Sequence, residues 1–173
     1  MTSGLGRALV AGAVGAAAVT LANEVGKRRI DDAPRLDLLG TRAVSKLSGK
    51  RAARFVPGKR KKLARTAFAG DLVSNALYYA LVSPGRSARP VSRGLWMGVL
   101  AGVGAVVLGP KLGLGHRPSD ATLETAALTV AWYAIGGVAA GFAARALAPR
   151  AVVTEYLTPA IAAEYPWPPA QRV

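Results

Sequence analysis

The side chains best able to do chemistry lie around Asp71, inside a stretch that is otherwise apolar. Asn75 follows Asp71 by one helical turn and Tyr78 or Tyr79 by about two, so a helix would place Asp71, Asn75 and one of the tyrosines on one face. If that helix crosses a membrane, its ionisable group is costly and predicts a functional site. The first hypothesis is a polar intramembrane pocket that binds a cation, a proton or a cationic headgroup.

Two acidic residues extend this hypothesis, and two simpler interpretations compete with it. Glu24 ends the first apolar segment and Glu124 opens the last, and the predicted topology sets both toward the same side as Asp71. In the first competing interpretation, Asp71 pairs with a loop arginine such as Arg65 and orients the helices. In the second, Asp71 is an exposed carboxylate whose side chain reaches toward water.

Familiar catalytic patterns are missing from the sequence. There is no cysteine and a single histidine, His116, which excludes thiolate chemistry and histidine-rich metal or haem sites. His116 and Asp120 are separated by three residues, whereas membrane acyltransferases separate such a pair by four. Acid–base catalysis would then rest on isolated carboxylates. We expect no enzyme, no metal and no cofactor.

The charge balance defines the class of protein. The 173 residues carry 23 Lys and Arg against nine Asp and Glu, a net charge of +14, while 51% are hydrophobic. A soluble globule would carry both signs of charge at about a quarter of its positions. A disordered basic tail would lack the apolar content.

Long runs without charge predict helices that cross a membrane. A soluble helix of this length should show a polar stripe, and residues 125–144 show none. The fold class we expect is all-α, an integral membrane four-helix bundle within residues 1–150, followed by a tail at 151–173 rich in proline and aromatic residues. A helix needs about 20 apolar residues to span a bilayer, and the four expected spans are about 5–24, 66–84, 94–112 and 124–147.

The positions of the cations predict the topology. Residues 27–65 hold 14 of the 23 Lys and Arg, so the positive-inside rule makes this loop cytoplasmic and both termini external in a multi-pass protein of the cell (inner or plasma) membrane. Arg86, Arg89 and Arg93 in the second connection oppose this orientation. A cleaved signal peptide is the alternative for the first segment, but the cations directly after it favour a retained span.

The basic loop contains two features. Leu36, Leu39, Ala43 and Leu47 recur at helical spacing, which predicts an amphipathic helix in the membrane interface. The cations beyond it predict contact with anionic lipid headgroups, or else only fix the topology. Specific nucleic-acid binding is not expected, because Phe55 alone interrupts the cations as a stacking residue. The headgroup contacts we expect are Arg51, Arg54, Lys59, Arg60, Lys61 and Lys62.

Glycines four residues apart predict close helix packing. Small residues at this spacing form a groove that lets a neighbouring backbone approach. The glycine-zipper packing we expect lies within the four-helix unit; a homo-oligomer or a larger membrane complex is the alternative. The glycines concerned are Gly94, Gly98 and Gly102 in the third span and Gly137 and Gly141 in the fourth.

The chain also resembles small uncharacterised four-span bacterial membrane proteins. The resemblance rests on Asn23-Glu24 at the end of the first span, on 32–40, and on Gly70-Asp71 at the second span. It implies the four-span architecture and no particular activity.

Three functions follow from these observations. The leading one is a non-catalytic accessory or scaffolding element that packs through glycine-rich faces and contacts anionic lipid. The second is a small transporter or channel-like binder that uses Asp71 and Asn75. The third is a membrane enzyme of an unrecognised kind.

Overall fold

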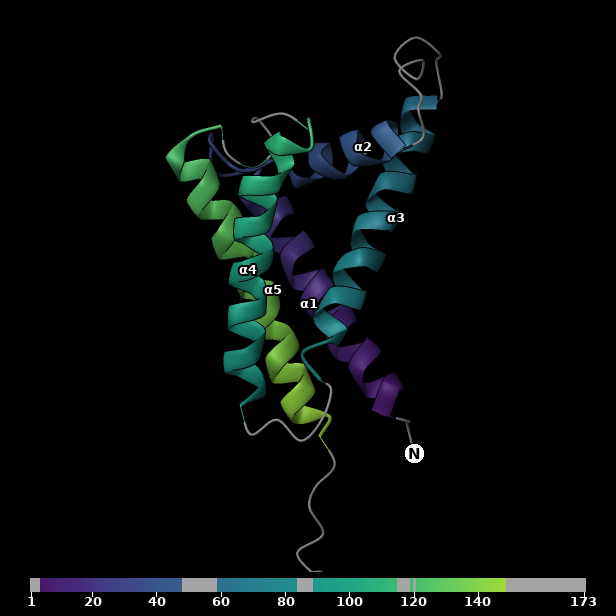
Figure 1. Ribbon diagram of the computed structural model, residues 1–173, viewed down its shortest axis with the longest axis vertical. Coiled ribbons are helices and arrows are strands. Elements are labelled where there is room, and N and C mark those ends of the chain that lie inside the picture. The colour runs from purple at the N-terminus through teal and green to yellow at the C-terminus, as the bar shows by residue number, and fades with distance from the viewer. Residues whose placement is uncertain (1–3, 48–58, 84–88, 115–118, 120, 149–173) are drawn as a thin grey trace, which may run out of the picture.

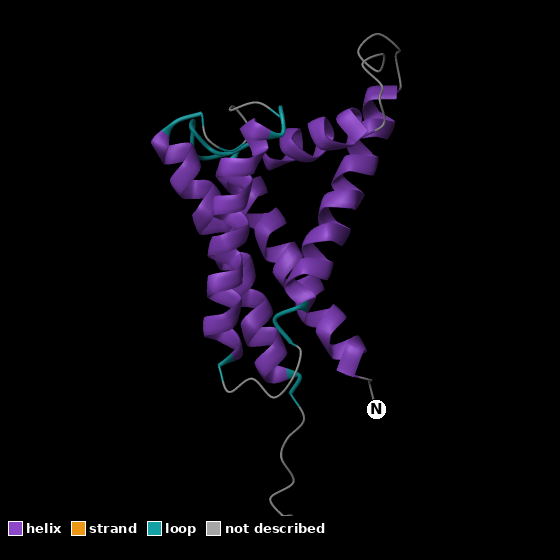
Figure 2. Cartoon of the chain, viewed as in Figure 1, coloured by secondary structure: helices purple, strands orange, loops and turns teal. Residues whose placement is uncertain are grey.

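The computed structural model describes residues 4–47, 59–83, 89–114, 119 and 121–148, and the regular structure within them is entirely helical (Figures 1 and 2). This confirms the all-helical prediction for the described residues. The tail at 151–173 lies outside them. The five helices are α1 (Gly4–Gly26), α2 (Leu36–Leu47), α3 (Lys59–Ala80), α4 (Pro90–Lys111) and α5 (Leu123–Ala146).

Four helices run along the length of the molecule, and the short α2 lies across one end, hereafter the α2 end (Figure 1). α1 and α4 run toward the α2 end, while α3 and α5 run away from it. The start of α1 and the last turn of α5 therefore lie at the opposite end. This up-and-down order follows from the connections, which join consecutive long helices at alternating ends.

Three helices, α1, α4 and α5, are long and apolar enough to cross a membrane. Their bounds agree within a few residues with the predicted spans 5–24, 94–112 and 124–147. α3 is not among the three. It begins at Lys59 rather than near residue 66, so its first turns carry the cations that the sequence suggested were loop, and it ends at Ala80 rather than at 84.

α4 and α5 form the most extensive helix pair, and glycines line their contact. The backbone of Gly94 lies against that of Gly137, so a methyl group on either would overlap the other helix. A Cβ atom added to Gly98 would lie 2.7 Å from the Cα atom of Ala134, and one added to Gly102 would lie 2.6 Å from Val130 Cα. These distances leave no room for a side chain.

α1 crosses both α3 and α5 at close range. A Cβ atom on Gly12 would lie 2.7 Å from the backbone nitrogen of Ala80 in α3. One turn further on, a Cβ atom on Gly15 would lie 2.9 Å from the Cβ atom of Ala140 in α5. The second half of α3 is thereby held beside two of the three long apolar helices.

The distribution of apolar side chains is inverted relative to a soluble protein. Glycine, alanine, threonine and tyrosine make many of the helix contacts, with Val19 and Trp132 also inside, whereas many leucines and valines and Trp96 lie outside. Leu100 is 66% exposed and Trp96 is 64% exposed, although water would favour burying both. An exposed apolar surface of this extent predicts a partner that is itself apolar.

Candidate functional site

The polar residues of α3 form a stripe, as their spacing predicted, and their polar groups bond mainly within α3 and once to α4. The Asn75 side chain hydrogen-bonds to the Asp71 carboxylate. The Ser74 hydroxyl donates to the Asp71 carbonyl oxygen at 3.0 Å, within α3 itself. The Tyr78 hydroxyl donates across to α4, to the carbonyl oxygen of Met97 at 2.8 Å. The stripe therefore makes hydrogen bonds within α3 and one hydrogen bond from α3 to α4.

A groove of about 460 Å³ opens between this stripe and α4. Its volume falls in the range of small-molecule sites, about 300–1,000 Å³. Its wall is mainly apolar. The lining residues are Leu39 of α2; Ser74, Asn75 and Tyr78 of α3; Ala101, Gly104, Ala105, Leu108 and Gly109 of α4; Leu112 and Leu114 beyond it; and Tyr133 of α5.

Of the two tyrosines that the spacing left open, Tyr79 does not join the stripe, because it lies on a different face and packs in the core. It is fully buried, and its hydroxyl donates to the carbonyl oxygen of Tyr133 in α5 at 2.7 Å. Its ring also fits where Gly15 of α1 and Gly136 of α5 leave space. One aromatic side chain thus joins three helices. A backbone acceptor has no sequence signature, so residue spacing alone could not reveal this contact.

The structure does not gather the predicted acidic residues into one site. Asp71 lies twelve residues after the start of α3, about 18 Å along the axis at 1.5 Å per residue. Glu24 ends α1 and is paired with Lys27 at 2.6 Å, and Glu124 is exposed in the first turn of α5. Within the described residues, no three acidic or histidine side chains are placed to hold a metal ion.

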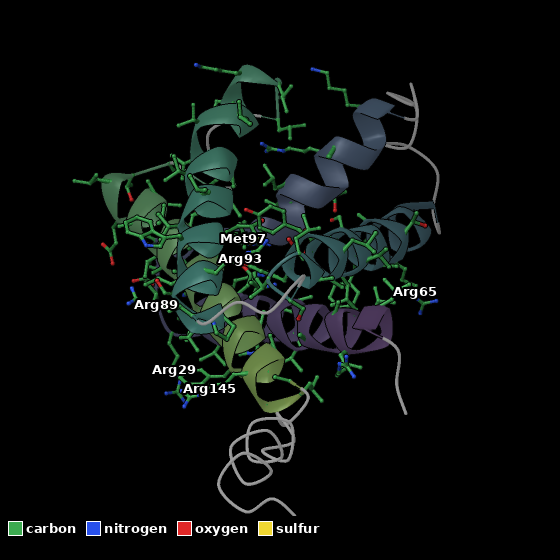
Figure 3. All side chains as sticks on the ribbon, turned by 60° about the horizontal axis from the view of Figure 1, so that its bottom comes forward. Arg29, Arg65, Arg89, Arg93, Met97 and Arg145 are labelled. Atoms are coloured by element: carbon green, nitrogen blue, oxygen red, sulfur yellow. The ribbon has the colours of Figure 1, made fainter. Side chains whose placement is uncertain are left out.

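The proposed pairing of Asp71 with Arg65 is also not observed. Six residues along one helix set the two side chains about 120° apart around the axis. Arg65 is exposed and extends away from the helices in Figure 3. Between these two described residues there is no ion pair, and the partner of the Asp71 carboxylate is the Asn75 side chain.

At the α2 end, two cations of α2 bind carbonyl groups that follow α4. Arg42 donates to the carbonyl oxygen of Leu114 at 2.5 Å, and Lys46 donates to that of Leu112. The chain ends α4 in a Schellman turn: Gly113 has a φ of +70°, and the Leu114 N–H reaches the Gly109 carbonyl at 3.0 Å. Cations near the C-terminal end of a helix are electrostatically favoured.

Two apolar residues of α2, Leu36 and Leu39, pack on protein. Leu36 is buried with the core residues Val19 and Trp132, and Leu39 lies near Gly109 and lines the groove. The linker before α2 is joined to α5 by a 2.9 Å hydrogen bond from the Thr125 hydroxyl to the Asp32 carbonyl. α2 is therefore anchored on the ends of the long helices.

The structure gives little information on the cations that we expect to contact lipid headgroups. Arg51 and Arg54 lie outside the described residues. Lys59, Arg60, Lys61 and Lys62 form the first turn of α3, but their side chains are not described. The predicted packing glycines, in contrast, all lie at the α4–α5 contact: Gly94, Gly98, Gly102, Gly137 and Gly141.

The arrangement is compatible with a small membrane protein, since three apolar helices of membrane-spanning length present large apolar side chains outward. No family model matches the chain, and no curated protein or solved structure is significantly similar to it. Its function must therefore be argued from its own residues.

Proposed function

We propose that this chain is a small integral membrane protein that acts as a non-catalytic accessory or scaffolding element and contacts anionic lipid at its α2 end. The observation that carries the proposal is the inverted surface. Small residues make the closest helix contacts, while many leucine and valine side chains, together with Trp96 and Phe142, lie outside. In the hydrocarbon core of a bilayer, exposing these apolar side chains carries no hydrophobic penalty.

In this proposal the fourth span of the bundle is the predicted segment of about 66–84, of which α3 supplies the part that ends at Ala80. Its contact with α1 at Gly12 and the bond from Tyr79 to α5 hold it between helices of membrane-spanning length. Its outward residues Phe68, Val73 and Leu77 are each more than half exposed and apolar. If α1 and α5 cross the bilayer, their contacts with this part of α3 keep it in the bilayer as well.

α2 then lies at the membrane interface on the cytoplasmic side. It crosses the ends of the long helices rather than running beside them (Figure 1). The cations of 27–65 are on this side, where they meet acidic headgroups at about 1 kcal/mol per nearby Lys or Arg. Both termini face the other side.

The absence of cysteine makes the topology directly testable. Ala121 and Ala148 are both exposed and lie just before and just after α5, at opposite ends of the molecule. We expect a membrane-impermeant maleimide added to intact cells to label Ala148→Cys and to leave Ala121→Cys unlabelled until the membrane is permeabilised. Labelling of both variants in intact cells would contradict a membrane-spanning α5, and the reverse pattern would overturn the orientation.

The accessory role needs its own experiment. Native mass spectrometry of the protein, extracted gently from its own membranes, should show a stoichiometric protein partner. A lone chain without a protein partner would contradict the accessory role while leaving the membrane topology intact.

A further inference from the structure

We propose that the groove between α3 and α4 holds one acyl chain of an anionic phospholipid, with the lipid phosphate at the cations of the α2 end. This inference rests on the proposed membrane insertion, and it names the lipid site within that function. It follows from four features of the groove: its access, its wall, its unfilled glycine and its charged end.

The groove is open from the side. α4 packs mainly on α5, and α3 packs mainly on α1 and α2, so little contact closes the space between α3 and α4. In a bilayer this side opening faces lipid tails. A chain can therefore enter from the membrane without crossing the protein.

The wall suits a hydrocarbon better than a hydrated solute. Three of its polar side chains already have partners: Ser74 bonds to the Asp71 carbonyl, Asn75 to the Asp71 carboxylate, and Tyr78 to Met97. A water-soluble ion or solute would need unsatisfied donors and acceptors to replace its hydration. Apart from Tyr133, the remaining lining is alanine, glycine and leucine.

The surroundings of Gly104 show unoccupied space inside the groove. It lines the groove, and a Cβ atom added there would meet nothing within 4 Å. Gly102, two residues earlier on the same helix, would place a Cβ atom 2.6 Å from α5. The α4 face toward α3 thus has unfilled space where the α5 face has none.

Cations collect at the α2 end of the groove. Arg42 and Lys46 are held by the carbonyl groups of Leu114 and Leu112, two residues of the groove lining. Lys111 is exposed beside them, and among the described residues no carboxylate forms an ion pair with either lysine. An ammonium has three donors and a guanidinium five, so donors remain after one carbonyl is bound. A phosphate fits this end, and an apolar chain fits the rest.

The test measures bound lipid directly. The full chain is reconstituted in phosphatidylcholine bilayers containing a minor share of phosphatidylglycerol, extracted in mild detergent, and examined by native mass spectrometry. We expect one phosphatidylglycerol molecule to remain per chain. Gly104→Phe, which fills the groove, should lose this lipid at least tenfold, whereas Gly104→Ala should keep it.

A second variant tests the charged end. Lys46→Gln combined with Lys111→Gln should remove the preference for phosphatidylglycerol over phosphatidylcholine. Asp71→Asn should leave lipid retention unchanged, whereas a cation site at Asp71 would show itself by loss of a bound cation. Thermal melting in detergent verifies that each variant is folded.

Three results would overturn the inference: no lipid retained by the unmodified chain, equal retention by folded Gly104→Phe, or no preference for the anionic lipid. None of them bears on the labelling of Ala121→Cys and Ala148→Cys. The lipid site can therefore fail while the membrane topology stands, and a failed topology would be seen independently.

Discussion

The two sides of α4 use small residues in opposite ways. Toward α5, Gly94, Gly98 and Gly102 let two backbones meet with no space left. Toward α3, Gly104 leaves open space beside the groove. The comparison teaches that a glycine in such a helix can have either of two structural roles. It permits close packing where a neighbouring helix covers it, and it leaves open space where none does.

The two sides also differ in what lies beside their interhelical hydrogen bonds. Where the helices touch, side-chain hydroxyls bond to backbone carbonyls, as Tyr79 does with Tyr133 in α5. Where α3 and α4 separate, the same kind of bond, from Tyr78 to Met97, borders a groove. The molecule thus has a closely packed half beside a more open half.

The largest expected effect compares one substitution on the two sides. Gly98→Leu forces a side chain into the backbone of α5 and should destabilise the protein by about 3 kcal/mol, at the upper end of the cost of overpacking. Gly104→Leu extends into the groove and should leave the melting temperature nearly unchanged. Thermal unfolding in detergent measures both. Equal loss in the two variants would refute the distinction between a closed and an open side.

The next effect distinguishes the two neighbouring tyrosines. Tyr79→Phe removes a buried hydrogen bond between helices and should cost about 1 kcal/mol. Tyr78→Phe removes a similar bond at a half-buried position and should cost less. Chemical denaturation in mixed micelles compares them, and a larger cost at Tyr78 would place the critical contact of α3 at the groove instead.

A smaller effect concerns the attachment of α2. Arg42→Met keeps an aliphatic side chain but removes the donor to the Leu114 carbonyl, so α2 should be cleaved faster by protease with global stability lowered by about 1 kcal/mol. Arg28→Met is the matched control, since Arg28 is exposed in the same basic region. Identical cleavage of both variants would show that Arg42 does not hold α2.

The smallest effect is expected at Gly104 itself. Gly104→Ala gains helix propensity without meeting any atom, so it should raise stability by at most about 1 kcal/mol. Gly102→Ala, two residues away, should lower it. Opposite signs in the two melting curves support the comparison, and equal signs oppose it.

The sequence predicted the helices more successfully than the contacts between them. The runs without charge located α1, α4 and α5 closely, because spanning a bilayer requires a composition that is visible in the sequence alone. The sequence places the start of α3 near residue 66, whereas the helix begins at Lys59. The dense cations there suggest a loop, although lysine and arginine are good helix formers.

The candidate site was predicted only in part. Helical spacing correctly set Asn75 one turn from Asp71, where the two side chains hydrogen-bond. The partners of Tyr78, Tyr79 and Arg42 are backbone carbonyls of distant segments, and an acceptor present in every residue leaves no trace in a sequence. The groove depends on how far two helices separate, which local spacing does not determine.

The most direct test of the account asks whether the apolar exterior faces lipid. Trp96 is 64% exposed on α4 and Trp132 is 6% exposed inside the bundle, so each can serve as the sole reporter once the other tryptophans are replaced by phenylalanine. In bilayers of lipids brominated along the acyl chain, we expect the fluorescence of Trp96 to be strongly quenched and that of Trp132 to be nearly unaffected. Equal quenching of the two, or none at Trp96, would contradict the proposed membrane-embedded bundle.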